Sequence, residues 1–335
     1  MEARILCREK LGPLIDAWCS QHQVIAPADE LAYKVVASSQ EIYLSEGKPR
    51  RSLKEFFFPN REELFAYTQQ GRDVSLVDRS AATTGTSRVV FGARPCEVYA
   101  LTILDKVFGW DYRDASYLER RRNTTIVSLA CREPAATCFC TSLGGSPTSP
   151  RGTDLLFTPL EDVYYIESVT ERGQALVDEC STFFQASDVA HDRARARFAQ
   201  QAEARIARRI DVSTLPERLR FDSPVWAKLT EQCLDCGVCT FLCPTCHCFD
   251  IQDEGRPERG VRVRLWDSCA FREFTKTAVS QPRPTHSSRY RQRIMHKFNY
   301  YPSNFHELLC VGCGRCIEHC PAGIDIRQVL ETVKE

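Results

Sequence analysis

Along the first two-thirds of the chain, short runs of β-branched and aromatic residues alternate with amphipathic stretches. Runs of this kind, bounded by polar or turn-forming residues, are typical of strands. We therefore predict strands at Tyr33–Ala37, Val89–Gly92, Thr125–Leu129 and Val163–Val169. Helical patterns lie between these runs, so this part of the chain is predicted to fold as a mixed α/β domain.

Three helices are predicted in the same region from their first residues and their periodicity. Asn60, with Glu63 three places later, is a capping pattern before an apolar stretch. Pro95 opens a helix that is predicted to end at Phe108. The segment Asp192–Ile210 is rich in Ala and Arg and has a weak apolar stripe, which predicts a mostly solvated helix.

The composition changes abruptly near residue 220, where cysteine-rich turns separated by helical patterns begin. We expect an α/β domain at residues 1–220 and a second domain at residues 221–335. Phe271–Val279 and Ile324–Val333 are predicted helices. The basic aromatic segment Arg283–Tyr301 is predicted to be a solvated helix or a docking surface for an acidic partner.

The overall composition excludes several classes of protein. The 335 residues include 44 Lys and Arg and 44 Asp and Glu, so no net charge directs the chain to nucleic acid or to an anionic membrane. No apolar run approaches the roughly 18–20 residues that span a bilayer. The N-terminal residues lack the pattern of a signal peptide. We expect a cytoplasmic protein with no nucleic-acid partner and no membrane span.

The chain contains 18 cysteines, and eleven of them follow residue 232. In a reducing compartment, clustered cysteines indicate metal or redox chemistry more often than disulfides. Two runs have the spacing C-x2-C-x2-C-x3-C-P, which is that of two-cluster bacterial ferredoxins. The first run is Cys233, Cys236, Cys239 and Cys243, and the second is Cys310, Cys313, Cys316 and Cys320.

This spacing favours two [4Fe–4S] clusters in an α-helical ferredoxin domain. Three thiolates on one tight loop can converge on three irons of a cubane, and the proline turns the fourth cysteine elsewhere. In two-cluster ferredoxins that fourth cysteine ligates the other cluster. The expected ligands are Cys233, Cys236, Cys239 and Cys320 for one cluster, and Cys310, Cys313, Cys316 and Cys243 for the other.

Zinc is the alternative metal for cysteine pairs of this kind. A structural zinc site needs four ligands, which two pairs supply. It leaves the third cysteine of each run and the Cys-Pro ending unexplained, so we favour iron–sulfur clusters.

A looser group of cysteines in the first domain is a candidate third site. Cys96 lies at a predicted strand-to-helix turn, and Cys131 ends the next predicted strand. Adjacent strands of an α/β sheet bring such turns to one edge, where sites tend to form. Together with Cys138 and Cys140, four thiols are available for a third iron–sulfur cluster. The alternative is that all four are small buried hydrophobic residues.

The remaining cysteines have no clear role in the sequence, and the common nucleotide-binding motifs are absent from it. Cys246, Cys248 and Cys269 lack an evident fourth ligand, so both ligation and packing near the clusters are open. No G-x-G-x-x-G or G-x-x-x-x-G-K-[ST] motif is present, and no catalytic arrangement stands out, so no catalytic residue is expected. The isolated cysteines, which are expected to be structural, are Cys7, Cys19 and Cys180.

Several motifs together resemble those of a known family. They are F-G-A-R-P-C-E at Phe91–Glu97, C-F-C-T-S-L-G-G at Cys138–Gly145, C-P-T-C-H-C-F-D at Cys243–Asp250, R-G-V-R-V-R-L-W-D-S-C ending at Cys269, and C-V-G-C-G-R-C at Cys310–Cys316. In this combination the sequence resembles the iron–sulfur β subunit of cytoplasmic sulfhydrogenases, which are NAD(P)-linked nickel–iron hydrogenases. It also resembles the corresponding iron–sulfur subunit of anaerobic sulfite reductase. The resemblance covers most of the chain.

The resemblance implies a non-catalytic electron-transfer subunit of a larger oxidoreductase complex. In such complexes the similar subunit lies between a catalytic subunit, which has a nickel–iron centre or a sirohaem, and a flavin-bearing subunit that oxidises NAD(P)H. The resemblance also favours a cluster at the N-terminal cysteines. One alternative is a heterodisulfide-reductase-like subunit that itself reduces a sulfur substrate. Another is a structural or redox-sensing iron–sulfur protein.

Overall fold

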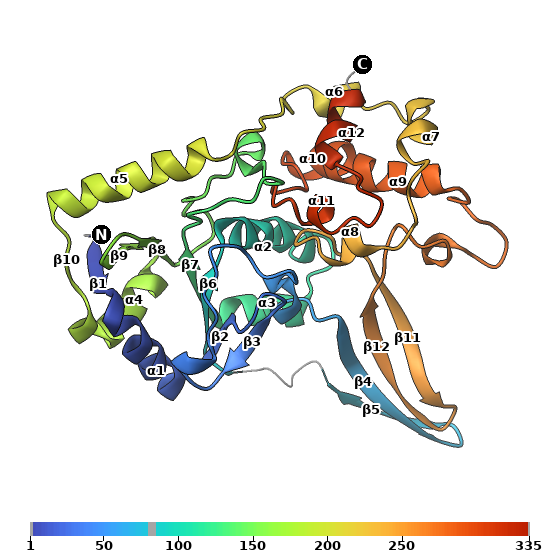
Figure 1. The fold of residues 1–335 in the computed structure, drawn as a ribbon. Helices are drawn as coiled ribbons and strands as arrows, with labels where there is room; N and C mark the ends of the chain where they lie inside the picture. Colours follow the sequence, from blue (N-terminus) through green and yellow to red (C-terminus); the bar gives the residue numbers. More distant parts are fainter. Residues whose placement is uncertain (1–2, 80–84, 334–335) are drawn as a thin grey trace.

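A computed structural model of the chain describes residues 3–79 and 85–333. Its largest element is an eight-stranded sheet in the order β10-β1-β9-β8-β7-β6-β2-β3 (Figure 1). The centre of the sheet is parallel, from β2 through β6 and β7 to β8, and the outer pairs are antiparallel. The strands are β1 Arg4–Cys7, β2 Gln23–Pro27, β3 Tyr33–Val36, β6 Arg88–Ala93, β7 Thr124–Leu129, β8 Leu155–Pro159, β9 Val163–Ser168 and β10 Gln185–Ala186.

Both faces of this sheet are buried, as its continuous apolar strands require. Alternate residues of β6 serve the two faces. Phe91 packs with Trp18 of α1 on one face, and Val90 belongs to the cluster of Leu101 from α2 on the other. The helices of this part are α1 Leu11–Gln21, α2 Pro95–Phe108, α3 Ala115–Arg122, α4 Glu171–Glu179 and α5 Val189–Ala204.

The four predicted strands and the helix that Pro95 opens are confirmed. The predicted helix Asp192–Ile210 is confirmed as α5, but it begins earlier and ends at Ala204. Its start is set by Asp188, whose side chain accepts a hydrogen bond from the backbone N–H of His191 in a capping box. Short 3-10 turns are Arg8–Lys10, Ser39–Glu41, Leu53–Phe56, Cys140–Leu143 and Ser181–Phe183.

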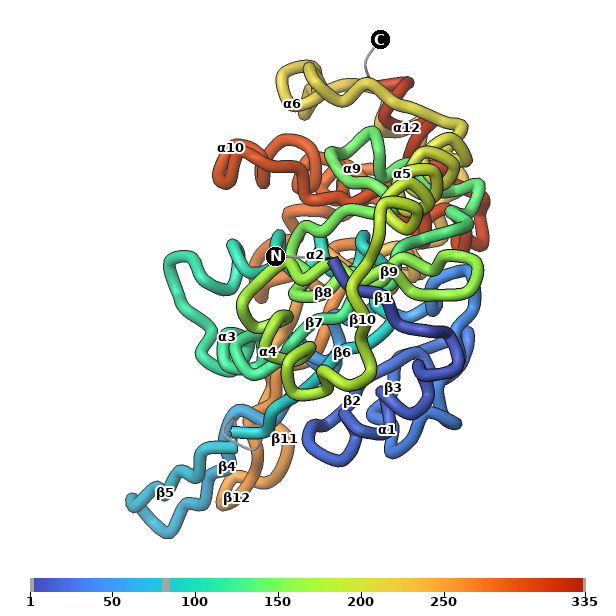
Figure 2. The backbone as a smooth tube through the Cα atoms, turned by 90° about the vertical axis from the view of Figure 1, so that its left-hand side faces the viewer, coloured from blue at the N-terminus to red at the C-terminus, as the bar shows by residue number. Residues whose placement is uncertain are grey.

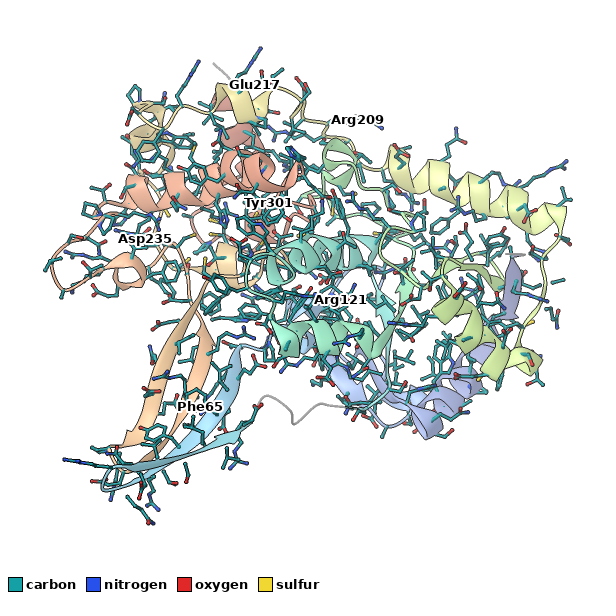
Figure 3. All side chains as sticks on the ribbon, turned by 180° about the vertical axis from the view of Figure 1, so that it is seen from behind. Phe65, Arg121, Arg209, Glu217, Asp235 and Tyr301 are labelled. Atoms are coloured by element: carbon teal, nitrogen blue, oxygen red, sulfur yellow. The ribbon has the colours of Figure 1, made fainter. Side chains whose placement is uncertain are left out.

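A second sheet projects from the body of the molecule as a four-stranded antiparallel arm (Figure 2). Its order is β11-β12-β4-β5, so strands from early and late in the chain pair directly. Phe65 lies on this arm, far from Tyr301 and Asp235 in the C-terminal part (Figure 3). The strands are β4 Arg61–Gln70, β5 Asp73–Asp78, β11 Phe249–Arg256 and β12 Arg259–Trp266.

The arm corrects two expectations. The helix predicted after Asn60 is wrong, because the segment forms β4 and pairs with β5 on one side and β12 on the other. Pairing on both sides overrides the local capping pattern. The hairpin of β11 and β12, which lies between the two cysteine runs, was not predicted.

A buried ionic network joins the base of the arm to the main body. Glu62 of β4 forms ion pairs with both Arg120 of α3 and Arg264 of β12, and Arg264 also pairs with Asp114. The carboxylate of Glu62 and both guanidinium groups are almost fully buried. The carboxylates compensate the buried guanidinium groups, as such groups require.

The rest of the chain is built of short helices around the cysteine runs (Figure 1). The helix predicted at Phe271–Val279 is wrong, since this segment contains only the 3-10 turn Glu273–Thr275. The helix predicted at Ile324–Val333 is confirmed as α12. The helices are α6 Leu215–Arg218, α7 Val225–Leu229, α8 Val238–Phe241, α9 His286–Met295, the π-helix η8 His296–Tyr300, α10 Tyr301–Phe305, α11 Arg315–Glu318 and α12 Ile326–Thr332.

Within the described residues, no helix combines the length and the apolar character needed to cross a membrane. The division of the chain near residue 220 stays a prediction. The arm and the cysteine loops both bring residues from the two sides of that position into contact.

Candidate metal centre

The predicted ligand cysteines surround three neighbouring cavities. The first, which we call the outer cavity because its Cys236 is exposed, is lined by Cys233, Cys236, Cys239 and Cys320. The second, the inner cavity, is lined by Cys243, Cys310, Cys313 and Cys316. The third, the N-terminal cavity, is lined by Cys96, Cys131, Cys138 and Cys140.

The structure therefore gathers the twelve cysteines in the three sets that the sequence predicts. In the outer and inner cavities, three cysteines of one run meet the fourth cysteine of the other run. Ligation itself stays a prediction. In residues 3–79 and 85–333, no three His, Cys, Asp or Glu side chains are grouped so as to hold a single metal ion.

Local backbone geometry shapes the outer cavity. Gly237 has a φ of +73°, and a Cβ there would lie 2.7 Å from the ring of Phe271. Gly237 also precedes α8, so the chain turns tightly between Cys236 and Cys239. Cys236 is exposed, and the outer cavity thus lies close to solvent.

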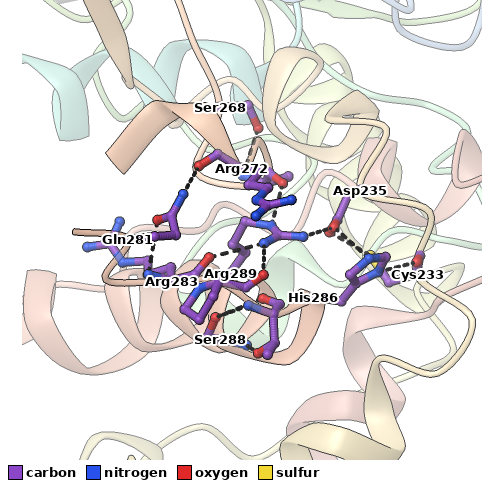
Figure 4. Close-up of polar contacts among 12 residues, drawn as sticks. Cys233, Asp235, Ser268, Arg272, Gln281, Arg283, His286, Ser288 and Arg289 are labelled. Atoms are coloured by element: carbon purple, nitrogen blue, oxygen red, sulfur yellow. Dashed lines mark hydrogen bonds and ion pairs between the residues drawn. The ribbon is translucent and has the colours of Figure 1, made fainter. Parts of the chain in front are cut away.

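The polar residues beside the outer cavity form one network (Figure 4). Asp235 forms ion pairs with Arg289 and with His286, whose Nε2 lies 3.3 Å from Asp235 Oδ2. Nδ1 of His286 lies 3.1 Å from the carbonyl oxygen of Cys233. The Cys233 Sγ lies 3.8 Å from Asp235 Oδ1. The single carboxylate at this cavity is therefore already matched by a buried cation.

The inner cavity is held against the first part of the chain. The backbone N–H of Phe139 donates to the carbonyl of Gly312 at 2.9 Å. Arg315, which follows in the same run, is fully buried and pairs with Glu97 of α2. Its guanidinium also donates to the carbonyl of Pro49 at 2.8 Å. These contacts fix the second cysteine run to α2, the helix that carries Cys96.

The N-terminal cavity forms at the ends of two adjacent parallel strands. Cys96 is in the first turn of α2, directly after β6, and Cys131 follows β7. Arg94 donates to the carbonyl of Ala130 at 3.0 Å and so ties the two strand ends together. Cys138 Sγ lies 3.7 Å from the carbonyl oxygen of Cys313. The sheet edge thus faces the second cysteine run.

The three cavities are contiguous. Cys316 lines both the outer and the inner cavity, and Cys313 lines both the inner and the N-terminal cavity. Each neighbouring pair of cavities therefore shares a cysteine in its lining.

Burial makes several of these thiols poor thiolates when no metal is bound. It raises the pKa of Cys310 to about 11 and that of Cys316 to about 12. In the N-terminal cavity it raises the pKa of Cys140 to about 12. A bound metal supplies the positive charge that deprotonates a coordinating thiol. The chemistry of the donor set thus fits metal–thiolate centres.

Unpartnered polar atoms at the cavities also fit clusters. Arg293 lines both the outer and the inner cavity, and it is 4% exposed. Among the described residues, neither Nε nor Nη2 of Arg293 has a hydrogen-bond partner, and the same holds for the hydroxyl of Tyr290 at the outer cavity. Buried donors of this kind need acceptors, and cluster sulfurs are acceptors.

The other cysteines lie outside the three sets. The neighbouring Cys243 raises the pKa of Cys246, and the neighbouring Cys248 raises the pKa of Cys269. Cys246, Cys248 and Cys269 line none of the three cavities. Among the isolated cysteines, Cys180 is buried in the main core.

The sequence interpretation of Arg283–Tyr301 as a solvated helix or docking surface is wrong. Its helix α9 and the π-helix η8 turn basic side chains inward, and Arg289, Arg293 and Lys297 are all buried. Their spacing of four residues was visible in the sequence and predicts a common helix face. The cysteine runs on either side were the signal that this face meets the cavities.

Comparison with known proteins defines the class of this chain. Residues 232–324 match the family model of a 4Fe-4S dicluster domain, so this part of the molecule is an iron–sulfur domain. The match spans both cysteine runs and the helix α9 between them.

A relative then gives the family. The chain is 32% identical over 313 residues to sulfhydrogenase 2 subunit beta of Pyrococcus furiosus, and the match covers 90% of this chain and 89% of the relative. The chain belongs to the family of sulfhydrogenase β subunits. No solved structure matches it significantly.

Proposed function

We propose that this chain is the electron-transfer subunit of a hydrogenase-type oxidoreductase complex, with three [4Fe–4S] clusters in a row. The outer cluster is bound by Cys233, Cys236, Cys239 and Cys320, the inner cluster by Cys310, Cys313, Cys316 and Cys243, and the N-terminal cluster by Cys96, Cys131, Cys138 and Cys140. Residues 221–335 form the α-helical ferredoxin domain of this proposal, and residues 1–220 form the α/β domain with the third cluster.

One observation carries the proposal. Cys316 and Cys313 each line two adjacent cavities, so the three cysteine sets form one continuous series rather than separate sites. The series has two ends. The outer cavity opens beside the exposed Cys236, and the N-terminal cavity lies at the edge of the main sheet.

When bound, the clusters supply one-electron chemistry without making or breaking covalent bonds. The chain's own residues hold the series at short spacing and shield its middle from water. Cys310 and Cys313 are buried, and Arg293 directs donors between the outer and inner cavities. One electron enters at one end for each electron that leaves at the other.

The partners that fit this role are a flavin subunit that oxidises NAD(P)H and a subunit with a catalytic metallocentre. The relative's name favours the hydrogenase type, and the sirohaem sulfite reductase type is the second candidate. We expect the assembled complex in the cytoplasm.

The test uses the intact complex, purified anaerobically. Cys236→Ala and Cys313→Ala should each abolish NAD(P)H-linked turnover, because each removes a ligand of one cluster in the series. Dye reduction that needs only the flavin subunit should be unchanged. Cys19→Ala, which removes a cysteine outside the three cavities, is the matched control and should behave as the wild type. Coupled turnover in both cavity variants would refute the proposal.

Iron analysis tests the number of clusters. The chain should bind about twelve irons and about twelve labile sulfides if all three sets hold cubanes. Cys138→Ala should lower the iron content by about four and leave the signals of the other two clusters intact. An unchanged iron content in this variant would remove the N-terminal cluster from the proposal.

A further inference from the structure

One helical face supplies most of the positive charge at the outer and inner cavities. Arg289, Arg293 and Lys297 follow each other at intervals of four residues through α9 and η8. They are 4%, 4% and 2% exposed. Burial of three cations side by side is unfavourable unless negative charge is nearby.

Only the first of these cations has a carboxylate partner. Arg289 pairs with Asp235 at the outer cavity. For Arg293 and Lys297, the described part of the chain contains no carboxylate within ion-pair distance. Both residues line the inner cavity, so the negative charge that balances them belongs there.

Lys297 makes direct contact with a cysteine of the inner set. Its ammonium donates to Cys243 Sγ at 3.3 Å, to Thr245 Oγ1 at 3.0 Å and to the carbonyl of Leu309 at 3.0 Å. These three acceptors account for all three protons of the ammonium. Cys243 belongs to the first run, and Leu309 precedes Cys310 of the second. Lys297 therefore bridges the two chain segments that enclose the inner cavity.

The backbone of Lys297 is fixed as firmly as its side chain. The N–H of Leu309 donates to the carbonyl of Lys297 at 2.9 Å. Lys297 also lies in the π-helical turn His296–Tyr300, an irregularity that is frequent at functional sites. The position of the ammonium relative to Cys243 is therefore set by the fold and not by a mobile side chain.

We propose that Lys297 raises the reduction potential of the inner cluster, because its buried ammonium lies next to a ligand sulfur of that cluster, Cys243 Sγ. This inference rests on the proposed function. Reduction adds one negative charge to a cluster, and hydrogen bonds and cations at ligand sulfur stabilise the added charge. The effect is strong here because water does not screen a buried contact.

A second buried lysine provides a matched control. Lys54 is also 2% exposed, but its ammonium donates to the backbone carbonyl of Cys246 at 2.8 Å and lies 3.9 Å from the centre of the Trp266 ring. It touches no sulfur of the three predicted ligand sets. Lys54→Met removes a buried charge from the same region without removing a contact to a ligand.

The experiment is an anaerobic redox titration of the intact complex, followed by electron paramagnetic resonance. Lys297→Met should lower the equilibrium constant for one-electron reduction of the inner cluster at least tenfold, which corresponds to about 59 mV. Lys297→Arg, which keeps the charge, should stay within threefold of the wild type. Lys54→Met should have a smaller effect than Lys297→Met. Cys236→Ser perturbs only the outer cluster and Cys138→Ala only the N-terminal cluster, so the signal that both variants leave unchanged is that of the inner cluster.

The outcomes separate this inference from the proposed function. A wild-type complex without two reducible ferredoxin-type clusters overturns both. Two clusters with an unchanged inner potential in Lys297→Met overturn only the role of Lys297, and so does an equal or larger shift in Lys54→Met. If the Lys297→Met variant loses iron, the same titration and iron analysis are carried out on Lys297→Gln. Retained iron with a lowered potential supports the inference, and loss of the inner cluster from both variants assigns Lys297 a structural role instead.

Discussion

Gly312 is a residue at which the second cysteine run closely approaches the first part of the chain. Its φ is +64°, in the left-handed region that side chains disfavour. A Cβ at this position would lie 2.6 Å from both the backbone nitrogen of Cys140 and the carbonyl carbon of Phe139. Backbone atoms cannot yield as a flexible side chain does. A glycine is thus needed to bring the inner and N-terminal cavities together.

Gly312→Ala should therefore be much more harmful than a glycine replacement at an open site. Left-handed strain and overpacking together should cost about 2–5 kcal/mol. Gly323→Ala is the matched control, because Gly323 has a φ of +66° but no atom within 4 Å of the place that a Cβ would take. It should cost about 1 kcal/mol. Thermal unfolding and iron retention measure both, and equal losses in the two variants would contradict the account.

Among the elements, the arm depends on the buried pairs around Glu62. Arg264→Met leaves the carboxylates of Glu62 and Asp114 without one of their cations, and breaking a buried pair typically costs about 3–5 kcal/mol. Arg262→Met, two residues away on the same strand, removes an exposed pair with Asp253 and should cost about 0–1 kcal/mol. Differential scanning calorimetry should show the large decrease in unfolding temperature for Arg264→Met alone.

The elements also differ in how far the sequence reveals them. The central strands and α2 could be predicted because their signals are local, namely β-branched runs and a proline at the start of a helix. Strand β4 could not, because its identity depends on β12. The contact between Glu62 and Arg264 joins residues 202 positions apart. The short capping pattern favours a helix only weakly, and the hydrogen bonds of β4 to β12 and β5 favour the strand more strongly.

In the candidate site too, some features have a local sequence signal and others depend on distant parts of the chain. The spacing of the two runs predicted which cysteines meet, since that spacing reflects the shape of a single loop. The inward direction of Arg293 and Lys297 was indicated less directly, by their four-residue spacing between the two cysteine runs. Basic residues on a helix usually face solvent, and only the placement of the helix against the cavities reverses this expectation.

In the molecule as a whole, the main sheet and the helices around the cysteine runs have different main apolar clusters, and a smaller cluster joins α2 to the second cysteine run. The sheet has apolar clusters on both faces. The helices around the cysteine runs share a cluster that includes Leu330, Phe298 and Cys310. This cluster includes a predicted iron ligand, Cys310, so its packing depends on the order of the cysteine loops.

Removal of iron should therefore affect the two regions differently. Chelation under reducing conditions should increase amide hydrogen exchange in α9, α11 and α12, because metal binding and folding are coupled where ligands come from distant segments. Strands β6 and β7 should stay protected. Mass spectrometry of the apo and holo forms gives the comparison. Uniform protection in both forms would show that the loops are ordered without metal.

The arm also has an evolutionary consequence. A recombination event near residue 220 would separate β4 from β12, and the loop of Phe139 from its partner at Gly312. Neither fragment would contain all the strands and contacts that it needs to fold, so we expect that recombination does not exchange the iron–sulfur part as a separate unit. Insertions and duplications should be tolerated at the tips of the arm and excluded from its base. The parts of the chain before and after residue 220 are expected to have been inherited together.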